Sequence, residues 1–143
     1  MNIDLRNKKA LIGGSSGGIG KAIAQQLAES GASITLMARN ENKLKSTLAI
    51  LDTSKGQSHQ YTIVDFSNYD IYKKKISAFF ELNTIDILIN NTQGPSAGSP
   101  LEKKVEDYQD AFNLLFKTVV FTTELALPYM NELPRGRAVE VSK

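Results

Sequence analysis

The sequence contains no cysteine, no tryptophan and a single histidine, His59. The absence of cysteine excludes a disulfide framework and thiolate chemistry, and fits a reducing compartment. His59 has no acidic cluster beside it, so we expect no metal site. No apolar run reaches the roughly 20 residues of a membrane helix, and the first residues lack the apolar stretch of a signal peptide. With a net charge of only +2, we expect a cytoplasmic protein that binds neither membrane nor nucleic acid.

Apolar and amphipathic segments alternate along the whole chain. Short apolar runs predict strands at Lys9–Gly13, Ser33–Ala38, Gln60–Val64, Ile85–Asn90 and Arg137–Val141. Helical periodicity predicts helices at Gly18–Ser30, Asn42–Leu51, Asn68–Leu82 (with Ser67 as N-cap) and Val105–Asn131. This alternation favours one domain, residues 1–143, with an open, doubly wound parallel sheet of the α/β class.

The last predicted helix carries apolar residues at helical spacing, which we interpret as core: Tyr108, Phe112, Leu115 and Val119. Pro128 lies late in this helix and should kink or end it. The segment Thr92–Pro100 has the composition of a loop and follows a predicted strand. Open α/β sheets place their ligands at that end of the strands.

A glycine-rich segment, Gly14-x-x-x-Gly18-x-Gly20, follows the first predicted strand and opens the first helix. Glycines let the backbone approach a pyrophosphate, and the helix N-terminus directs free N–H groups toward it. The alternative is an ordinary glycine-rich turn. We expect a dinucleotide to contact Gly14, Ser15, Ser16, Gly18, Ile19 and Gly20.

The second predicted strand ends at Ala38, and Arg39 and Asn40 follow it. An acidic residue about 20 residues after the last glycine binds a ribose 2′-hydroxyl, whereas an arginine there accommodates a 2′-phosphate. Ala38 supplies no carboxylate, and the guanidinium of Arg39 suits a phosphate. We therefore expect NADP(H) rather than NAD(H), held by Arg39 and Asn40. The alternative is a solvated arginine before a helix.

These motifs resemble the N-terminal part of the short-chain dehydrogenase/reductase family, nearly from end to end. Gly14, Gly18, Ile19 and Gly20 match the family's TGxxxGIG, with Gly13 in place of its threonine. The match extends to two further landmarks, at the ends of the third and fourth predicted strands.

Asp65-Phe66 lies where the family has an aspartate and an apolar residue beside the adenine ring. Asn90-Asn91-Thr92-Gln93 matches the family's NNAG turn, so the resemblance implies that Asn91 lies close to the cofactor. The run to Pro95 is similar to an NNTGGP variant of 3-oxoacyl-carrier-protein reductase-like members. The alternatives are that Asp65 only caps a helix with Ser67 and that Asn90-Asn91 only forms a turn.

The chain departs from the family at the catalytic positions. Gln93 replaces the last glycine of the NNAG turn, and Leu115 occupies the position of the family's catalytic asparagine, with Asn113 two residues away and facing elsewhere. Ser142 aligns with the family's non-catalytic serine and Lys143 with its catalytic one.

The family's catalytic Tyr-x-x-x-Lys would follow beyond this point. The one such spacing here, Tyr69 to Lys73, lies on an earlier predicted helix. We interpret it as packing, because a Tyr and a Lys on one helix face usually pack at the surface. We therefore assign no catalytic residue.

The resemblance implies a Rossmann-like doubly wound sheet of order 3-2-1-4-5, truncated after the fifth strand. It implies an oxidoreductase that interconverts an alcohol and a carbonyl by hydride transfer with NADP(H), inactive in this form. A non-catalytic dinucleotide-binding or interaction module, and an active enzyme with unusual residues, remain as alternatives. The chain is also expected to form a homo-oligomer through its long fourth helix or the exposed edge of its fifth strand.

Overall fold

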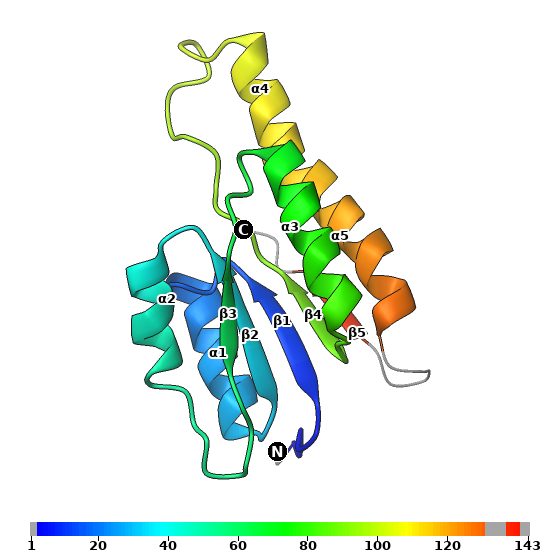
Figure 1. Ribbon diagram of the computed structural model, residues 1–143. Coiled ribbons are helices and arrows are strands. Elements are labelled where there is room, and N and C mark those ends of the chain that lie inside the picture. Colours follow the sequence, from blue (N-terminus) through cyan, green and yellow to red (C-terminus); the bar gives the residue numbers. More distant parts are fainter. Residues whose placement is uncertain (1–2, 131–136, 141–143) are drawn as a thin grey trace.

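A computed structural model of the chain describes residues 3–130 and 137–140 (Figure 1). The strands are β1 (Lys9–Gly13), β2 (Ser33–Ala38), β3 (Gln60–Ile63), β4 (Ile87–Asn90) and β5 (Arg137–Glu140). The helices are α1 (Gly18–Glu29), α2 (Glu41–Leu48), α3 (Tyr69–Leu82), α4 (Val105–Phe112), the π-helix η1 (Asn113–Lys117), α5 (Thr118–Ala126) and the 3₁₀-helix η2 (Leu127–Tyr129). All neighbouring strands pair in parallel, in the order β3-β2-β1-β4-β5. The expected fold class and strand order are confirmed.

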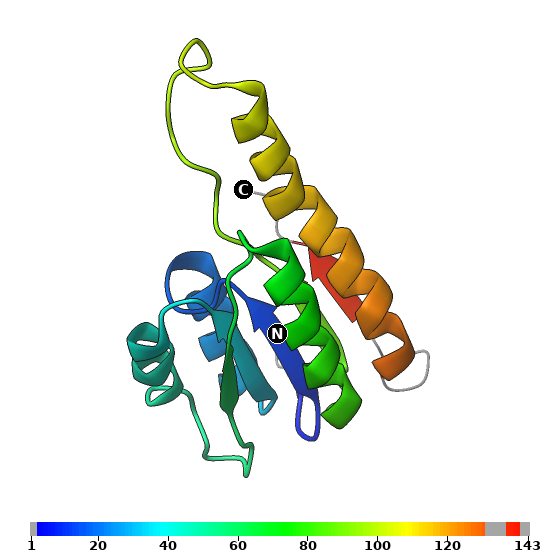
Figure 2. The ribbon, with the colours of Figure 1, turned by 45° about the horizontal axis from the view of Figure 1, so that its top comes forward.

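The sheet is the middle of three layers. Helices α1 and α2 cover one face, and α3 and α5 cover the other (Figures 1 and 2). Residues Ala10, Leu11 and Ile12 of β1 are apolar and buried, as expected of a strand covered on both faces: Ile12 faces α1 and α2, and Leu11 faces α3. Ala24 and Ala28 on α1 are completely buried, since their small side chains let the helix approach the sheet closely.

The helix after β3 begins one residue later than predicted. Asn68, not Ser67, is the N-cap of α3, because the Asn68 Oδ1 accepts a hydrogen bond of 3.2 Å from the backbone N–H of Ile71. The Ser67 hydroxyl instead donates to the Asp65 carboxylate over 2.6 Å. The carboxylate of Asp65 thus competes successfully for the serine, and the next polar residue caps the helix.

The predicted long helix is interrupted, and its presumed core residues face solvent. Tyr108, Phe112 and Leu115 are 57%, 51% and 41% exposed, and Val119 is half-buried. The buried residues follow a different stripe: Leu114, Thr118, Thr122 and Ala126. The reason is geometric, because α4 rises past the carboxyl end of the sheet, where no described layer lies beneath it (Figures 1 and 2). Pro128 lies in η2, which ends the helical segment as predicted.

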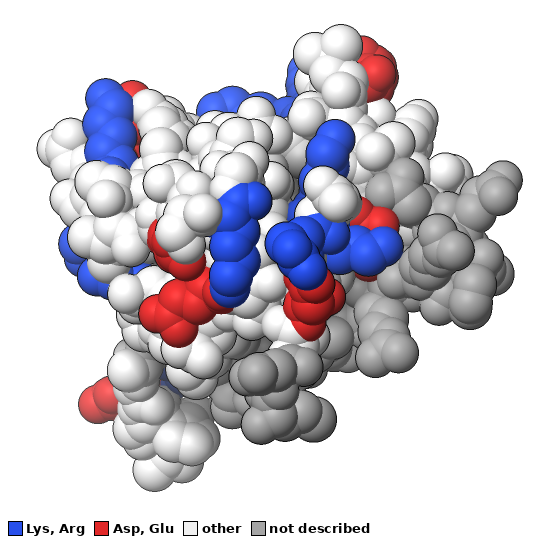
Figure 3. Space-filling view, turned by 90° about the horizontal axis from the view of Figure 1, so that it is seen from below, with Lys and Arg blue, Asp and Glu red and all other residues white. Residues whose placement is uncertain are grey.

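Charged side chains of both signs lie next to one another on the face seen in Figure 3. Two ion pairs involve the N-terminal segment: Arg6 with Asp4 over 2.6 Å, and Lys8 with the buried Asp86 over 3.6 Å. Across the described residues, none of the helices has the length and apolar character needed to cross a membrane.

Candidate functional site

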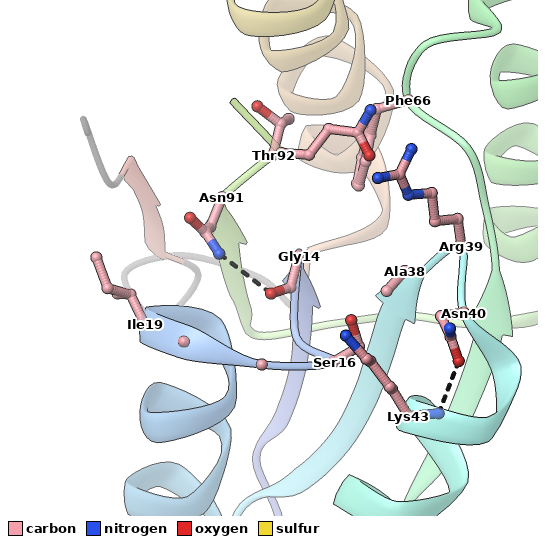
Figure 4. Close-up of a pocket in the computed structure, with 13 residues that line it drawn as sticks. Gly14, Ser16, Ile19, Ala38, Arg39, Asn40, Lys43, Phe66, Asn91 and Thr92 are labelled. Carbon is pink, nitrogen blue, oxygen red and sulfur yellow. Dashed lines mark hydrogen bonds between the residues drawn. The ribbon is translucent and has the colours of Figure 1, made fainter. Parts of the chain in front are cut away.

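A pocket of about 420 Å³ opens at the carboxyl ends of β1, β2 and β4 (Figure 4). The chain leaves β1 toward β2 on one side, whereas β4 lies on the other side of β1. Ligands of open α/β sheets bind at this switch in strand order. The lining residues are Gly14, Ser16, Gly17, Gly18, Ile19, Ala38, Arg39, Asn40, Lys43, Phe66, Asn91, Thr92 and Gln93.

The three motif glycines meet two different requirements. Gly18 has a φ of +53°, which favours glycine, and a Cβ placed on it would meet nothing within 4 Å. A Cβ on Gly14 would lie 2.7 Å from the backbone oxygen of Asn91, and one on Gly20 would lie 2.4 Å from the oxygen of Gly14. Gly18 therefore leaves open space in the pocket, while Gly14 and Gly20 allow close packing of its walls.

Gly13 stands where the resemblance predicts a threonine, and the structure gives the reason. A Cβ on Gly13 would lie 2.6 Å from the backbone oxygen of Asn91 and 3.3 Å from Cζ of Phe66. The turn after β4 thus lies directly against the end of β1, where no larger residue fits.

Asn91 joins the two central strands at the pocket. Its buried amide donates to the backbone oxygens of Gly13 and Gly14 over 3.1 and 3.4 Å, and these bonds hold the turn after β4 against the end of β1 and the start of the glycine loop. Within the described residues, the Asn91 Oδ1 has no hydrogen-bond partner. Leaving a buried acceptor unpaired costs about 1–3 kcal/mol of folding free energy. Other contacts of this pocket wall must offset that cost.

Ser15 was predicted to contact the ligand, but the structure places its side chain outside the pocket. Ser15 is completely buried. Its hydroxyl accepts a hydrogen bond from the Met37 N–H over 2.9 Å and lies 3.4 Å from the Met37 oxygen. Ser15 therefore ties the glycine loop to β2, and Ser16 is the serine that lines the pocket.

The far end of the pocket is formed where β2 passes into α2. The Asn40 Oδ1 caps α2 by accepting the Lys43 N–H over 2.9 Å. In Figure 4 the guanidinium of Arg39 turns toward Phe66, and the Lys43 side chain runs from α2 toward Ser16. Sequence reasoning missed Lys43, because its place in the pocket depends on how α2 is oriented.

Phe66 lines the pocket, whereas its neighbour Asp65 and the predicted Gly20 do not. The Ser67 hydroxyl and N–H both donate to the Asp65 carboxylate, over 2.6 and 2.9 Å. These bonds, with a smaller contribution from the positive charge of Arg39, lower the pKa of Asp65. The carboxylate therefore stays ionised at neutral pH, just behind the pocket wall.

Two described positions compared with catalytic residues, Leu115 and Asn113, do not line the pocket. Leu115 lies in η1 and is exposed, and the Asn113 amide oxygen accepts a bond from Gln109. Ser142 and Lys143 lie outside the described residues.

Tyr69 and Lys73 lie on α3, away from the pocket lining. The Lys73 ammonium is 5.4 Å from the centroid of the Tyr69 ring, and the Lys117 ammonium is 4.2 Å from it. This geometry is that of surface packing between α3 and the α5 side of the molecule.

His59 has a structural role. Its Nδ1 accepts the Ile34 N–H over 3.1 Å, so its Nε2 carries the hydrogen that it donates to the Asp52 oxygen over 2.8 Å. In the described part of the chain, no group of three or more His, Asp or Glu side chains is placed to hold a metal ion.

The parallel sheet with a glycine-rich loop at its switch point places the chain among the Rossmann-type dinucleotide-binding folds. The family model for short chain dehydrogenases matches residues 8–143, and the chain belongs to this family of oxidoreductases. An uncharacterized oxidoreductase of Staphylococcus epidermidis is 32% identical over 144 residues, covering 96% of this chain and 59% of that protein. A 3-oxoacyl-[acyl-carrier-protein] reductase of Chlamydia muridarum is 37% identical over 92 residues, covering 64% of this chain and 37% of that protein.

Solved structures of reductases also match the fold of this chain. L-sorbose reductase from Gluconobacter frateurii, complexed with NADPH and L-sorbose, matches with a TM-score of 0.83 at 29% identity, over 98% of this chain and 54% of that one. A 3-oxoacyl (acyl-carrier-protein) reductase from Agrobacterium tumefaciens with NADP bound matches with a TM-score of 0.85 at 26% identity, again over 98% and 54%. The chain thus spans less than two thirds of the length of these relatives.

Proposed function

We propose that this chain is the NADP(H)-binding part of a short-chain dehydrogenase/reductase that interconverts an alcohol and a carbonyl by hydride transfer. The observation that carries the proposal is the pocket itself. One cavity brings together the glycine loop before α1, the arginine after β2 and the asparagine turn after β4.

A dinucleotide fits the described residues. Gly18 leaves space for a pyrophosphate in front of the first turn of α1, where the N–H groups and the helix dipole favour an anion. Phe66 offers an aromatic ring for an adenine, and Arg39 and Asn40 border the place of the adjoining ribose. When bound, NADP(H) supplies the hydride chemistry, and the role of these residues is to orient its adenosine half.

Preference for the phosphorylated cofactor rests on charge. Ala38 offers no carboxylate to a ribose 2′-hydroxyl, while Arg39 offers a guanidinium at the pocket. The L-sorbose reductase and acyl-carrier-protein reductase structures are described with NADPH and NADP, respectively. The names of the relatives point to different substrates, so the proposal stops at the alcohol and carbonyl pair.

Isothermal titration calorimetry with NADP⁺ and NAD⁺ tests this proposal. A charge-assisted hydrogen bond contributes about 1.5–3 kcal/mol, so NADP⁺ should bind at least about tenfold more tightly. Arg39→Asp should reverse the preference, because a carboxylate repels the 2′-phosphate and accepts from the 2′-hydroxyl. Lys74→Asp makes the same change of charge on the exposed surface of α3 and should leave the preference intact. Equal affinities in the unmodified chain would contradict the NADP assignment, and no binding of either nucleotide would contradict the whole proposal.

A further inference from the structure

We propose that Lys43 is a second specificity-determining residue of the pocket. Its ammonium binds the 2′-phosphate of the cofactor from a different element and direction than Arg39 does. The inference rests on the proposed function. It adds a residue from α2, an element that the sequence motifs did not connect with the ligand.

The fixed position of Lys43 is the first part of the argument. It lies in the first turn of α2, and its backbone N–H is held by the Asn40 cap over 2.9 Å. From this anchored backbone its side chain extends along the pocket toward Ser16 (Figure 4). The Arg39 guanidinium turns the other way, toward Phe66. The two cations thus approach the same cavity from different elements and in different directions.

The charges around Lys43 are the second part. Glu41, the acidic residue of this helical turn, directs its carboxylate to Lys45 over 2.9 Å and to the Tyr61 hydroxyl over 2.9 Å. These bonds lower the pKa of Glu41 and raise the pKa of Lys45. Within the described part of the chain, the Lys43 ammonium forms no ion pair. Lys45 is therefore paired with Glu41 on the outer surface, whereas among the described residues the Lys43 ammonium at the pocket has no carboxylate partner.

The chemistry of the ligand follows from this arrangement. A phosphate on the 2′ position carries negative charge and accepts hydrogen bonds on several oxygens, so an ammonium, a guanidinium and the Ser16 hydroxyl can share it. A 2′-hydroxyl gains little from an ammonium that is already solvated. Lys43 should therefore affect only 2′-phosphorylated ligands, whereas Arg39, which lies on the Phe66 side, should affect the binding of the adenosine as well.

Calorimetry with adenosine 2′,5′-bisphosphate and 5′-AMP isolates this effect, because the two ligands differ only by the 2′-phosphate. Lys43→Met should weaken binding of the bisphosphate about tenfold or more and leave the affinity for 5′-AMP unchanged. Lys43→Arg should retain most of the affinity. Lys45→Met removes the same charge from the same helix and should change neither affinity. The effect of Lys43→Met should also shrink at high salt, since the side chain is exposed.

The outcomes separate this inference from the function on which it rests. If Lys43→Met leaves the affinity for the bisphosphate unchanged, or lowers both affinities equally, Lys43 is not a specificity determinant, and the cofactor site stands without it. If the unmodified chain binds neither ligand, the proposed function itself is wrong.

Discussion

Gly18 is required for two reasons: its φ is positive, and the space in front of its Cα is empty. In Gly18→Val the β-branched side chain is strained at this φ and fills the place of the pyrophosphate. We expect binding of NADP⁺ and NAD⁺ to be lost and the free energy of unfolding to fall by about 1–3 kcal/mol. Calorimetry and urea unfolding measure the two effects separately.

Gly56 provides the matched control for this variant. It has a φ of +82°, and a Cβ on it would also meet nothing within 4 Å, but it lies in the loop between α2 and β3, away from the pocket lining. Gly56→Val should lower stability by a similar amount and keep full binding. If Gly18→Val still binds the nucleotide, the pyrophosphate does not lie in front of Gly18.

The sequence predicted part of the pocket lining: two of its glycines, Gly14 and Gly18, and four of its polar residues, Ser16, Arg39, Asn40 and Asn91. Gly14 and Gly18 were identified because backbone conformation follows from the residue type itself. Ser15 was predicted as a ligand contact, but its side chain does not line the pocket, because whether a loop serine faces the cavity or the neighbouring strand depends on the path of the loop. Lys43 was missed, since its direction is set by the packing of α2 and no local pattern records it.

A buried polar contact joins helices α3 and α5, and its contribution to their packing can be measured. The Tyr72 hydroxyl and the Thr122 hydroxyl share a hydrogen bond, and Thr122 also donates to the Thr118 oxygen over 2.6 Å. Burial raises the pKa of Tyr72 above its ordinary value, so the phenol stays protonated and neutral. The two helices are thus joined by an uncharged contact in an apolar layer.

Removing the two hydroxyls one at a time should have unequal effects. Tyr72→Phe should lower the free energy of unfolding by about 0.5–1.5 kcal/mol, the net value of one hydrogen bond. Thr122→Val should cost about 1–3 kcal/mol, because it leaves the buried Tyr72 hydroxyl without a partner. In the double variant that penalty disappears, so its loss should be smaller than the sum of the single losses. Additive losses in urea unfolding would show that the two hydroxyls do not interact.

Strands were easier to predict than the last helix, for a physical reason. A strand covered on both faces is mostly apolar, as Ala10–Ile12 are and as Ile34–Ala38 are apart from Thr35, so β1 and β2 were predicted with the bounds that the structure gives them. An apolar stripe on a helix indicates that one face packs against another surface. It does not indicate whether that surface belongs to this sheet or to another molecule. The sequence therefore could not distinguish the buried stripe of α5 from the exposed one of α4, nor show that η1 would interrupt them.

At the scale of the whole molecule, the exposed apolar stripe predicts self-association. The large exposed side chains of this stripe are Val105, Tyr108, Phe112, Leu115, Phe116 and Val120. Among the described residues, no strand pairs with the outer edge of β5, and such an edge can pair with another chain. Light scattering over a dilution series should show a mass above that of the monomer, 15.7 kDa.

A paired substitution identifies the surface responsible. The rings of Phe112 and Phe116 stack on each other at 5.2 Å and are both exposed. Replacing both by lysine should shift the chain toward monomer and leave nucleotide binding unchanged, since neither lines the pocket. A monomer at every concentration in the unmodified chain would contradict the prediction.

The 143-residue chain by itself should bind the cofactor without turning it over. It has Leu115 at the position of the family's asparagine, and its Tyr-x-x-x-Lys spacing, Tyr69 to Lys73, lies on α3 away from the pocket lining. A missing general acid–base group alone costs about 10²–10⁴-fold in rate. NADPH absorbance should stay constant with a panel of aldehydes and ketones, in a preparation whose NADPH binding calorimetry has verified. Steady consumption of NADPH would show that other residues perform the catalysis.

The pocket residues that the structure describes lie between positions 14 and 93, whereas α4, α5 and β5 follow later in the chain. A ribosome therefore completes the lining before it begins the apolar helices. At roughly 5–20 residues per second, the interval until the end of α5 is on the order of a few seconds. The chain is thus synthesised with the described pocket residues first and the exposed apolar stripe of α4 and η1 after them.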